Sequence, residues 1–461
     1  MKAIVDPTHA LARGLAMIRT QFHIPDSFPP EVLAEAEAAA QRTPTEHADR
    51  TDTPFVTLDP ASSTDLDQAF AIDRDGQDLL LHYAIADVAW FVADDGAIDR
   101  EAWVRGTSQY LPDGKAPLYP PGLSEQAASL LPNGPRPAVI FIVRVAADGS
   151  VRLDRAERAI IRSRAKLAYD SVRDSDLPPD FAELSDRIAA ADDQRGASRV
   201  DPPEQEVHQV GPSDFELTYR PRLQSEDRNA AMSLACNLAV ADALLAHHTG
   251  LFRVMAPPDE HAIRRLRFTA RAFGLAWPEA ETLGQFQKNL SAADPRQAAF
   301  MLAVRRAGVG ASYAPYQAGV VPWHVAMAAT YAHATAPLRR LADRYVVRAA
   351  LAIANGQDVP DAVTQAFAKL PPVMAHADAL GGQIERAVVD LAEAVMLQGS
   401  EGQVFPAIVT DTDERGARMQ LRDEPVVARV AANGVQPGDA ISVRLVSTDP
   451  EQRLIAFQRV A

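Results

Sequence analysis

The sequence predicts an α+β protein, and three observations along the chain support this class. Short strands separated by turns fill residues 54–170, and long helical segments dominate residues 224–397. Five short β-rich runs, divided by Asp, Glu, Gly and Pro turns, occupy residues 402–461 and predict an OB-type barrel. The chain has 461 residues, enough for two or three domains.

Two short helices are expected before the strands. Apolar residues recur at helical spacing over residues 8–21, and Pro30 suits the first position of a helix that continues to about residue 42. The pair forms either a small helical module or an arm packed on the main domain, and both alternatives stay open. The expected domains are a helical N-terminal segment at 1–50, a main domain at 51–397 and a barrel at 402–461.

The remaining elements follow from apolar patterns and turn residues. Residues 163–172 are expected to be helical, and residues 173–222, charged and rich in proline, are expected to be mostly loop. Pro337 is a helix-start signal for a helix that runs to about residue 351. In the main domain, 79–91 is a long apolar segment that holds Asp87, and further strands are expected at 138–145 and 153–161. The other expected helices are 224–248, 257–274, 294–308 and 361–397. The expected barrel strands are 403–410, 417–421, 426–430, 441–446 and 454–458.

Composition limits the kinds of partner. The chain is 47% hydrophobic and 23% charged, as is usual for a globular protein, and its net charge is −15. Such a charge disfavours a general electrostatic hold on nucleic acid, so binding would need a local basic channel or metal ions. Lys occurs only five times among 46 basic residues, and the abundant Arg is suited to bidentate phosphate contacts.

The single cysteine, Cys236, excludes an intrachain disulfide and a Cys-based zinc site. A reduced, cytoplasmic setting is therefore expected. No stretch approaches 18 consecutive apolar residues, and the N-terminus lacks the apolar run of a signal peptide. We expect no membrane association and no obligate protein partner.

Three carboxylates, Asp59, Asp65 and Asp67, fall within nine positions between two apolar, strand-like flanks. Anions held so close repel one another unless a cation joins them. Oxygen ligands suit a hard ion, Mg²⁺ or alternatively Mn²⁺, better than zinc. An EF-hand is excluded, because Ala69 and Phe70 stand where that loop needs a ligand and a Gly. The alternative is an ordinary turn, in which Asp, Ser and Thr bond nearby amides.

Residues 58–70 read LDPASSTDLDQAF, which closely resembles the catalytic signature of the ribonuclease II family. That signature is written I-D-x₅-D-[ILM]-D-D-A, and Asp59, Asp65 and Asp67 match its first three acids at the same spacing. Gln68 stands where the fourth acid is expected. An amide oxygen can ligate Mg²⁺ but carries no charge, so one metal position is expected to be weak.

A second segment, residues 331–343, reads YAHATAPLRRLAD and resembles the family's Y-x-H-x-T-S-P-I-R-R-Y-x-D, with Ala in place of Ser. If Pro337 opens a helix, free backbone amides there would bind an anion. Arg339 and Arg340 in a first turn oppose the helix dipole unless an anion joins them, which indicates a phosphate clamp. The alternative is a solvated Arg pair balanced by Asp343.

Two tyrosines, Tyr110 and Tyr169, fall in segments similar to family positions at which tyrosines contact RNA bases near the 3′ end. Stacking on an aromatic ring tolerates any base, so such contacts suit a sequence-independent enzyme. The alternative for each is a core or boundary tyrosine.

The resemblance covers about residues 50–395 and the tail barrel. It implies an RNB catalytic domain, a mixed sheet packed with helices, followed by an S1-type OB-fold barrel. It also implies processive, divalent-metal-dependent hydrolysis of single-stranded RNA from the 3′ end to nucleoside 5′-monophosphates. We expect no pair of N-terminal cold-shock domains of the kind usual in the family, because about fifty residues precede the core and their pattern is helical.

The resemblance also implies roles for individual residues. The implied catalytic residues are Asp65, Asp67 and Arg339, and the implied metal ligands are Asp59, Asp65, Asp67 and Gln68. The implied RNA-binding residues are Tyr110, Tyr169, His333, Thr335, Arg339 and Arg340. The competing class is a catalytically weakened RNA-binding protein on a nuclease scaffold, which Gln68 favours, and a metal-dependent DNase is a weaker third.

Overall fold

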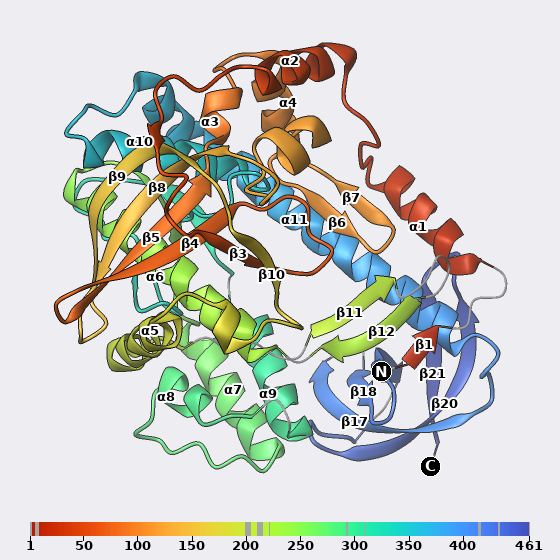
Figure 1. The fold of residues 1–461 in the computed structure, drawn as a ribbon. Coiled ribbons are helices and arrows are strands. Elements are labelled where there is room, and N and C mark those ends of the chain that lie inside the picture. The colour runs from red at the N-terminus through yellow and green to blue at the C-terminus, as the bar shows by residue number, and fades with distance from the viewer. Residues whose placement is uncertain are drawn as a thin grey trace.

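A seven-stranded mixed sheet forms the centre of the molecule, shown in the computed structural model of Figure 1. The structure describes residues 2–4, 9–198, 204–209, 215–220, 222–291, 294–308, 310–413, 416–431 and 434–460. The strand order is β10-β3-β4-β5-β8-β9-β2, with β10 parallel to β3, β2 parallel to β9 and the other neighbours antiparallel. The strands are β2 (Ala48–Asp49), β3 (Val56–Asp59), β4 (Gln68–Asp75), β5 (Asp78–Ala86), β8 (Arg136–Val145), β9 (Val151–Ile161) and β10 (Ala165–Ala168).

Strand β8 is buried almost throughout, which explains its continuous apolar sequence. Successive side chains of a strand point to opposite faces, so an unbroken buried run requires cover on both faces. Helices α6 (Gln224–Ala246) and α10 (Leu341–Ala354) pack on this sheet, and α5 (Phe181–Arg195) packs on α6. The predicted α+β class is confirmed.

Helix α6 is the one described helix that is long and apolar enough to cross a membrane. In the fold, however, 67% of its most apolar window is buried, and it packs against β5, β8 and β9. Its apolar sequence is therefore accounted for by its position in the core.

Several expectations for the middle of the chain are wrong. Helices α3 (Val88–Phe91) and α4 (Ala97–Arg105) interrupt the strands expected over residues 54–170. Residues 165–168, expected to be helical, form β10, which gains a parallel partner in β3 through pairs such as Ala165 with Val56. The loop expected over 173–222 contains helix α5 and the hairpin of β11 (Glu204–Gln209) and β12 (Phe215–Arg220). In α5, the buried residues Phe181, Leu184 and Ile188 carry a helical spacing that the surrounding charges obscure.

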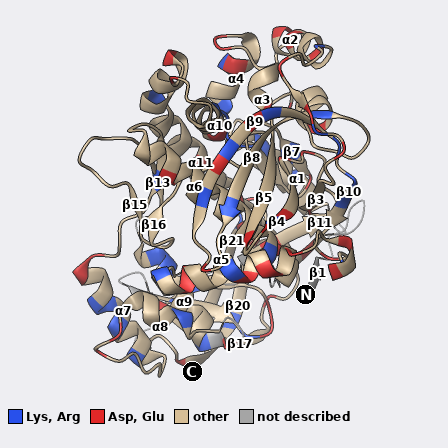
Figure 2. Cartoon of the chain, turned by 60° about the vertical axis from the view of Figure 1, so that its left-hand side comes forward, with Lys and Arg blue, Asp and Glu red and all other residues tan. Residues whose placement is uncertain are grey.

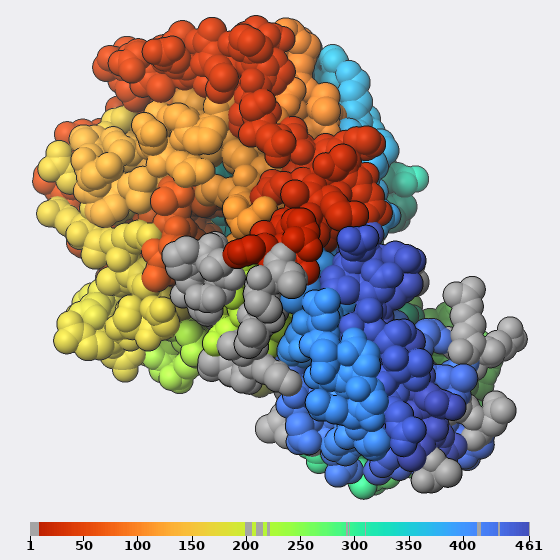
Figure 3. All heavy atoms as spheres, turned by 90° about the vertical axis from the view of Figure 1, so that its right-hand side faces the viewer, coloured from red at the N-terminus to blue at the C-terminus, as the bar shows by residue number. Residues whose placement is uncertain are grey.

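The tail forms a closed barrel in the order β17-β18-β19-β21-β20, as the sequence predicts. Figure 3 shows it as a lobe beside the N-terminal helix. Helix α11 (Asp361–Leu397) leads into it and contributes Leu391 and Val395 to a core shared with barrel residues such as Val409 and Met419. The barrel strands are β17 (Val404–Asp413), β18 (Gly416–Leu421), β19 (Val427–Ala431), β20 (Ala440–Asp449) and β21 (Leu454–Val460).

The two N-terminal helices contact different parts of the molecule. Helix α1 (Ala10–Gln21) packs on α11, and its Leu11 and Leu15 belong to the core shared with the barrel. Helix α2 (Pro30–Ala40) packs on α4 (Ala97–Arg105), and its Val32 joins the sheet core. This is the arrangement of a packed arm, while the domain boundaries themselves stay a prediction.

Helices α7 (Glu260–Ala272), α8 (Leu283–Lys288) and α9 (Pro295–Ala307) form a small unit with a core of its own, built around Phe286 and Phe300. Helix α9 lies next to β17 of the barrel, and Figure 2 colours several basic positions blue along α7 and α9. The remaining described elements are β1 (Lys2–Ile4), α3 (Val88–Phe91), β6 (Gln109–Leu111), β7 (Gly114–Ala116), η1 (Leu123–Ala127), η2 (Asp174–Asp176), β13 (Leu251–Val254), β14 (Ser312–Pro315), β15 (Trp323–His324) and β16 (Ala329–Thr330).

Candidate active site

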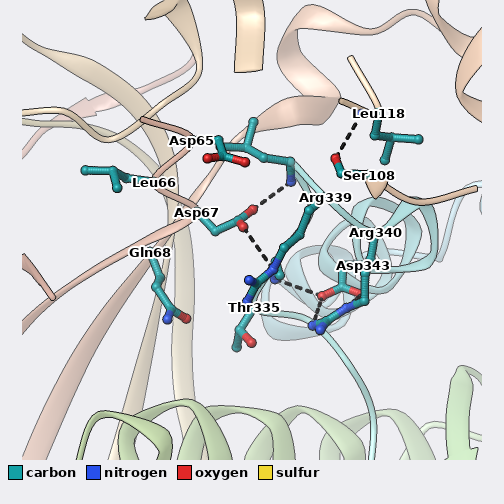
Figure 4. A network of polar contacts seen from close by, with 12 residues as sticks. Asp65, Leu66, Asp67, Gln68, Ser108, Leu118, Thr335, Arg339, Arg340 and Asp343 are labelled. Carbon is teal, nitrogen blue, oxygen red and sulfur yellow. Dashed lines mark hydrogen bonds and ion pairs between the residues drawn. The ribbon is translucent and has the colours of Figure 1, made fainter. Parts of the chain in front are cut away.

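Asp67 joins the two sequence motifs in space. It lies just before β4 and is only 5% exposed. Its Oδ1 accepts a hydrogen bond from the Leu338 amide at 2.7 Å, and its Oδ2 lies 3.5 Å from Nε of Arg339, as Figure 4 shows. Burial raises the pKa of Asp67 to about 7, against the opposing influence of Arg339. The acidic loop and the arginine turn therefore form one site.

Asp59 ends β3 beside this position. Its Oδ2 is buried and has no hydrogen-bond partner among the described residues. Burial raises the pKa of Asp59 to about 6, Arg339 and Lys166 lower it, and the charge of Asp65 raises it further. A buried carboxylate oxygen without a donor is costly, and a bound cation would remove that cost.

Asp65 has both carboxylate oxygens engaged by the hairpin of β6 and β7. Nζ of Lys115 lies 2.7 Å from Oδ1, and the Tyr110 hydroxyl donates to Oδ2 at 2.9 Å. The same ammonium lies 3.3 Å from Oε1 of Glu125, on the π-helical turn η1. No local sequence signal points to Lys115, because its partner Asp65 lies fifty positions away.

Gln68 faces away from the Asp67 carboxylate and toward α6 in Figure 4. It is the first residue of β4, and consecutive strand residues point to opposite faces. Its Oε1 accepts a hydrogen bond from the hydroxyl of the buried Tyr83 at 2.6 Å. The implied fourth metal-ligand position is thus taken up by a hydrogen bond inside the protein.

The arginine turn differs from its expected form. Helix α10 begins at Leu341 rather than at Pro337, so the predicted helix start is wrong. The reason is Asp343, whose buried carboxylate accepts the Ala336 amide at 2.8 Å and the Arg340 guanidinium at 2.9 and 2.7 Å. These bonds hold residues 336–340 in a turn before the helix.

The two arginines therefore have different surroundings. Arg340 is paired with Asp343, as in the alternative weighed for this pair, and its guanidinium is not directed at the acids. Arg339 has a side chain that is 48% exposed and approaches Asp67. Of the expected clamp, only Arg339 points into the site.

His333 and Thr335 support the segment before this turn. The Thr335 hydroxyl is buried and lies 2.8 Å from the hydroxyl of Ser233 on α6, and its implied RNA contact stays a prediction. His333 is half-buried, and its Nδ1 lies 2.9 Å from the Tyr313 hydroxyl. Burial and nearby arginines, Arg340 first among them, lower the pKa of His333 and keep it neutral.

Both tyrosines border the acids. Tyr110 is 53% exposed while its hydroxyl bonds Asp65. Tyr169 is partly buried, and its hydroxyl accepts a hydrogen bond from Nδ2 of Asn229 at 2.8 Å. Burial and the charge of Asp59 raise the pKa of Tyr169 to about 12. Both residues therefore contact an acid of the site, Tyr110 through the Asp65 carboxylate and Tyr169 through the main-chain carbonyl of Asp59.

The donor set fits a hard divalent ion, although no group of three or more His, Cys, Asp or Glu in the described ranges is already arranged around one position. The oxygens of Asp59, Asp65 and Asp67 are the ligand type that Mg²⁺ and Mn²⁺ prefer. Oδ2 of Asp59 is buried without a partner among the described residues, and burial raises the pKa values of Asp59 and Asp67, so a bound cation would stabilise both ionised acids.

A carboxylate loop at the edge of a mixed sheet, an arginine turn bonded to it and a closed barrel together define a nuclease of the ribonuclease II class. The chain belongs to the RNB family, whose domain model matches residues 47–355. The model of the RNase II-type exonuclease C-terminal S1 domain matches residues 403–460. The family consists of hydrolytic 3′–5′ exoribonucleases, and the resemblance read from the motifs is confirmed.

Relatives agree with this assignment. Ribonuclease R of Aquifex aeolicus is 26% identical over 97% of this chain and 70% of its own length. Exoribonuclease 2 of Cronobacter sakazakii is 28% identical over 82% of this chain and 61% of its own. Other curated relatives are matched over only about half of their length.

Among solved structures, Mycoplasma genitalium RNase R in complex with ribose methylated single-stranded RNA superimposes with a TM-score of 0.86. Its sequence identity is 20%, and the match covers 100% of this chain and 79% of that one. At this identity the likeness concerns the fold alone.

Proposed function

We propose that the protein is a divalent-metal-dependent exoribonuclease that degrades single-stranded RNA processively from the 3′ end to nucleoside 5′-monophosphates. The observation that carries the proposal is the Asp67 carboxylate, which is bonded to the Leu338 amide and approached by Arg339. This contact joins the acidic and arginine motifs. A cytoplasmic setting, and function without an obligate protein partner, stay predictions.

The residues of the site have different roles in the proposed hydrolysis. Arg339 is placed to neutralise the charge that develops on the scissile phosphate, because its guanidinium is exposed beside the acids. The Arg340–Asp343 pair holds the turn that presents Arg339. Tyr110 and Tyr169 offer ring faces to the last bases of the RNA, which supplies binding without sequence preference.

The divalent ion would be held by Asp59 and Asp67, with Asp65 beside them. When bound, it would supply an activated water and stabilisation of the leaving oxygen. Burial of Asp59 and Asp67 makes the ionised acids dependent on a cation, which supports a metal requirement.

The barrel and the α7–α9 unit are the proposed path of the incoming RNA. A cavity of about 860 Å³ lies between them, lined on one side by Arg296 and on the other by Arg422. Phe405 and Phe457 pack edge-on at 6.2 Å, and both belong to or pack against the core of the barrel. Binding there is accordingly expected to be chiefly electrostatic.

One assay tests the function. RNA and DNA labelled at the 5′ end are incubated with Mg²⁺, Mn²⁺ or EDTA, and products are resolved by size. We expect RNA, and not DNA, to shorten progressively with either metal and to stay intact in EDTA. Internal cleavage, or equal degradation of DNA, would contradict the proposal and favour the DNase alternative.

The second candidate is an RNA-binding protein with trace activity, which the uncharged Gln68 favours. A metal titration of RNA cleavage by wild type and Gln68→Asp distinguishes an active nuclease from an RNA-binding protein with trace activity. For an active enzyme, we expect clear cleavage by both proteins, with half-maximal rate at lower Mg²⁺ for the variant. A wild-type protein that is inert at every metal concentration, beside an active Gln68→Asp, would establish the binding protein.

A further inference from the structure

The ammonium of Lys115 lies among carboxylates of the acidic loop. It is 2.7 Å from Oδ1 of Asp65 and 3.3 Å from Oε1 of Glu125. The Thr64 hydroxyl holds Glu125 in place through a bond of 2.9 Å to its other oxygen. The Lys115 side chain is 18% exposed and that of Asp65 10%, so solvent screens this pair less than a surface pair.

The position of Lys115 is fixed by structure on both sides. Strand β7, which carries it, pairs with β6 so that Lys115 lies directly opposite Tyr110. Tyr110 bonds the second oxygen of the same carboxylate, at 2.9 Å. The hairpin of β6 and β7 thus places one ammonium and one hydroxyl against Asp65, and each oxygen of that carboxylate has a partner.

An ordinary ion pair would stabilise the fold slightly and have no further effect. This pair differs because Asp65 belongs to the same acidic loop as Asp59 and Asp67, and its charge adds, after burial, to the causes that raise the pKa of both. Neutralising Asp65 therefore changes the electrostatic potential at the two other acids. Gln68 adds no charge, and its amide oxygen is bonded to Tyr83.

We propose that Lys115 is a built-in counter-cation of the acidic loop, a positioning residue that holds Asp65 and limits the site to one divalent ion bound by Asp59 and Asp67. The ammonium lies 2.7 Å from Oδ1 of Asp65, and a second ion bound to that oxygen would meet a like charge at close range. This inference rests on the proposed metal-dependent function and specifies its metal requirement.

The test counts Mn²⁺ ions bound by the metal-free full chain, by calorimetry and by the electron paramagnetic resonance signal of free Mn²⁺. Lys115→Met removes the charge and keeps the length of the side chain, whereas Lys115→Arg keeps the charge. Lys288→Met is the matched control, because Lys288 pairs with Asp193 on the surface of another part of the chain. Asp59→Asn removes a proposed ligand, so the Mn²⁺ that this variant still binds measures binding elsewhere on the protein.

We expect one Mn²⁺ above the Asp59→Asn background for wild type, Lys115→Arg and Lys288→Met. Lys115→Met should bind a second Mn²⁺, or bind the first at least tenfold more tightly. Its melting temperature in EDTA should fall below that of wild type and recover on adding Mn²⁺. Such recovery would show that the variant lost a positive charge, because a misfolded protein would not recover.

Equal Mn²⁺ number and affinity in wild type and Lys115→Met would overturn the role of Lys115, as would two ions in wild type. One ion in wild type and a change in Lys115→Met, without RNA cleavage by either, would support Lys115 and contradict the proposed nuclease. An absence of specific Mn²⁺ binding in all variants would overturn both.

Discussion

The Asp67 carboxylate and the Leu338 amide form a hydrogen bond of 2.7 Å between residues 271 positions apart in the sequence. The bond fixes the acidic loop against the turn that carries Arg339. Because the carboxylate is buried and its other oxygen faces Arg339, the relative position of acid and arginine is set before any substrate binds.

Replacing Asp67 with Asn should abolish turnover and spare RNA binding. The amide oxygen of Asn can still accept the Leu338 bond, so the loop keeps its form, while the lost charge weakens metal binding. We expect a fall in kcat of roughly 10²-fold or more, with an unchanged RNA dissociation constant in a filter-binding assay. Wild-type turnover in this variant would remove Asp67 from the mechanism.

The neighbouring arginines should respond in opposite ways to truncation. Arg339→Ala should lower kcat by roughly 10²–10³-fold and leave the melting temperature nearly unchanged, because Arg339 is half exposed. Arg340→Ala leaves the fully buried Asp343 without its charged partner, with only the Ala336 amide still bonded to it, and should cost about 3–5 kcal/mol of folding stability. Denaturant unfolding and single-turnover kinetics on both variants distinguish the roles. Equal effects of the two changes would contradict this division.

Much of the fold follows from local sequence patterns. Helices α6 and α11 and the barrel strands appear where periodicity and turn residues place them, since each buries a face that its own sequence defines. The short strand β10 does not, because its conformation depends on pairing with β3, more than a hundred positions earlier. At residues 165–168, the tertiary contact with β3 overrides the helical conformation that the local sequence favours.

The sequence predicts which residue types make up the site, but not how their side chains are oriented or paired. Asp67 and Arg339 are named by their motifs and do meet. The pairing of Arg340 with Asp343, the direction of Gln68 and the presence of Lys115 depend on contacts that no spacing encodes. Side-chain hydrogen bonds of this kind decide which of several polar residues faces the substrate.

Glu393 makes stability depend on pH where α11 meets the barrel. Its Oε1 accepts bonds from Nε2 of Gln205 at 2.6 Å and from the Val427 amide at 2.9 Å. Burial raises its pKa from 4.5 to about 8. Between these values the folded state holds a proton that the unfolded state releases, so this group's contribution to stability is present at low pH and lost as pH rises toward 8.

The matched variant is Glu393→Gln, which stays neutral at every pH. Relative to it, wild type should lose up to about 1.4 kcal/mol per pH unit between pH 5 and 8. Unfolding by urea at several pH values measures the difference. Parallel stability curves for the two proteins would show that Glu393 does not titrate in this range.

The cleft between α9 and the barrel should determine binding of long RNA. Arg296→Gln combined with Arg422→Gln removes one cation from each wall and should weaken binding of long RNA several-fold. The slope of log affinity against log salt should become less steep by about one to two units. Cleavage of short oligomers should persist. Deletion of the barrel is a poorer test, because it would expose the core shared with α1 and α11.

Arg152→Gln is the control for this pair, since Arg152 is a mostly exposed residue of β9 in the main sheet. It changes net charge without touching the cleft and should leave affinity and salt dependence as in wild type. If the control lost as much RNA affinity, the weaker binding of the double variant would be due to its overall charge and not to the cleft.

Helix α11 belongs to both large cores of the molecule. Its first turns place Val363 and Phe367 in the sheet core, and its last turns place Leu391 and Val395 in the core of the barrel. With 37 residues it is about 55 Å long. The shared core fixes the barrel against the last turns of α11, and the length of this helix, which contains Pro371 and Pro372, sets the distance of the barrel from the sheet. For the proposed nuclease, the interval between the entry surface and the point of cleavage is constant, so a shrinking RNA should lose its hold on the barrel at one fixed remaining length, whatever its sequence.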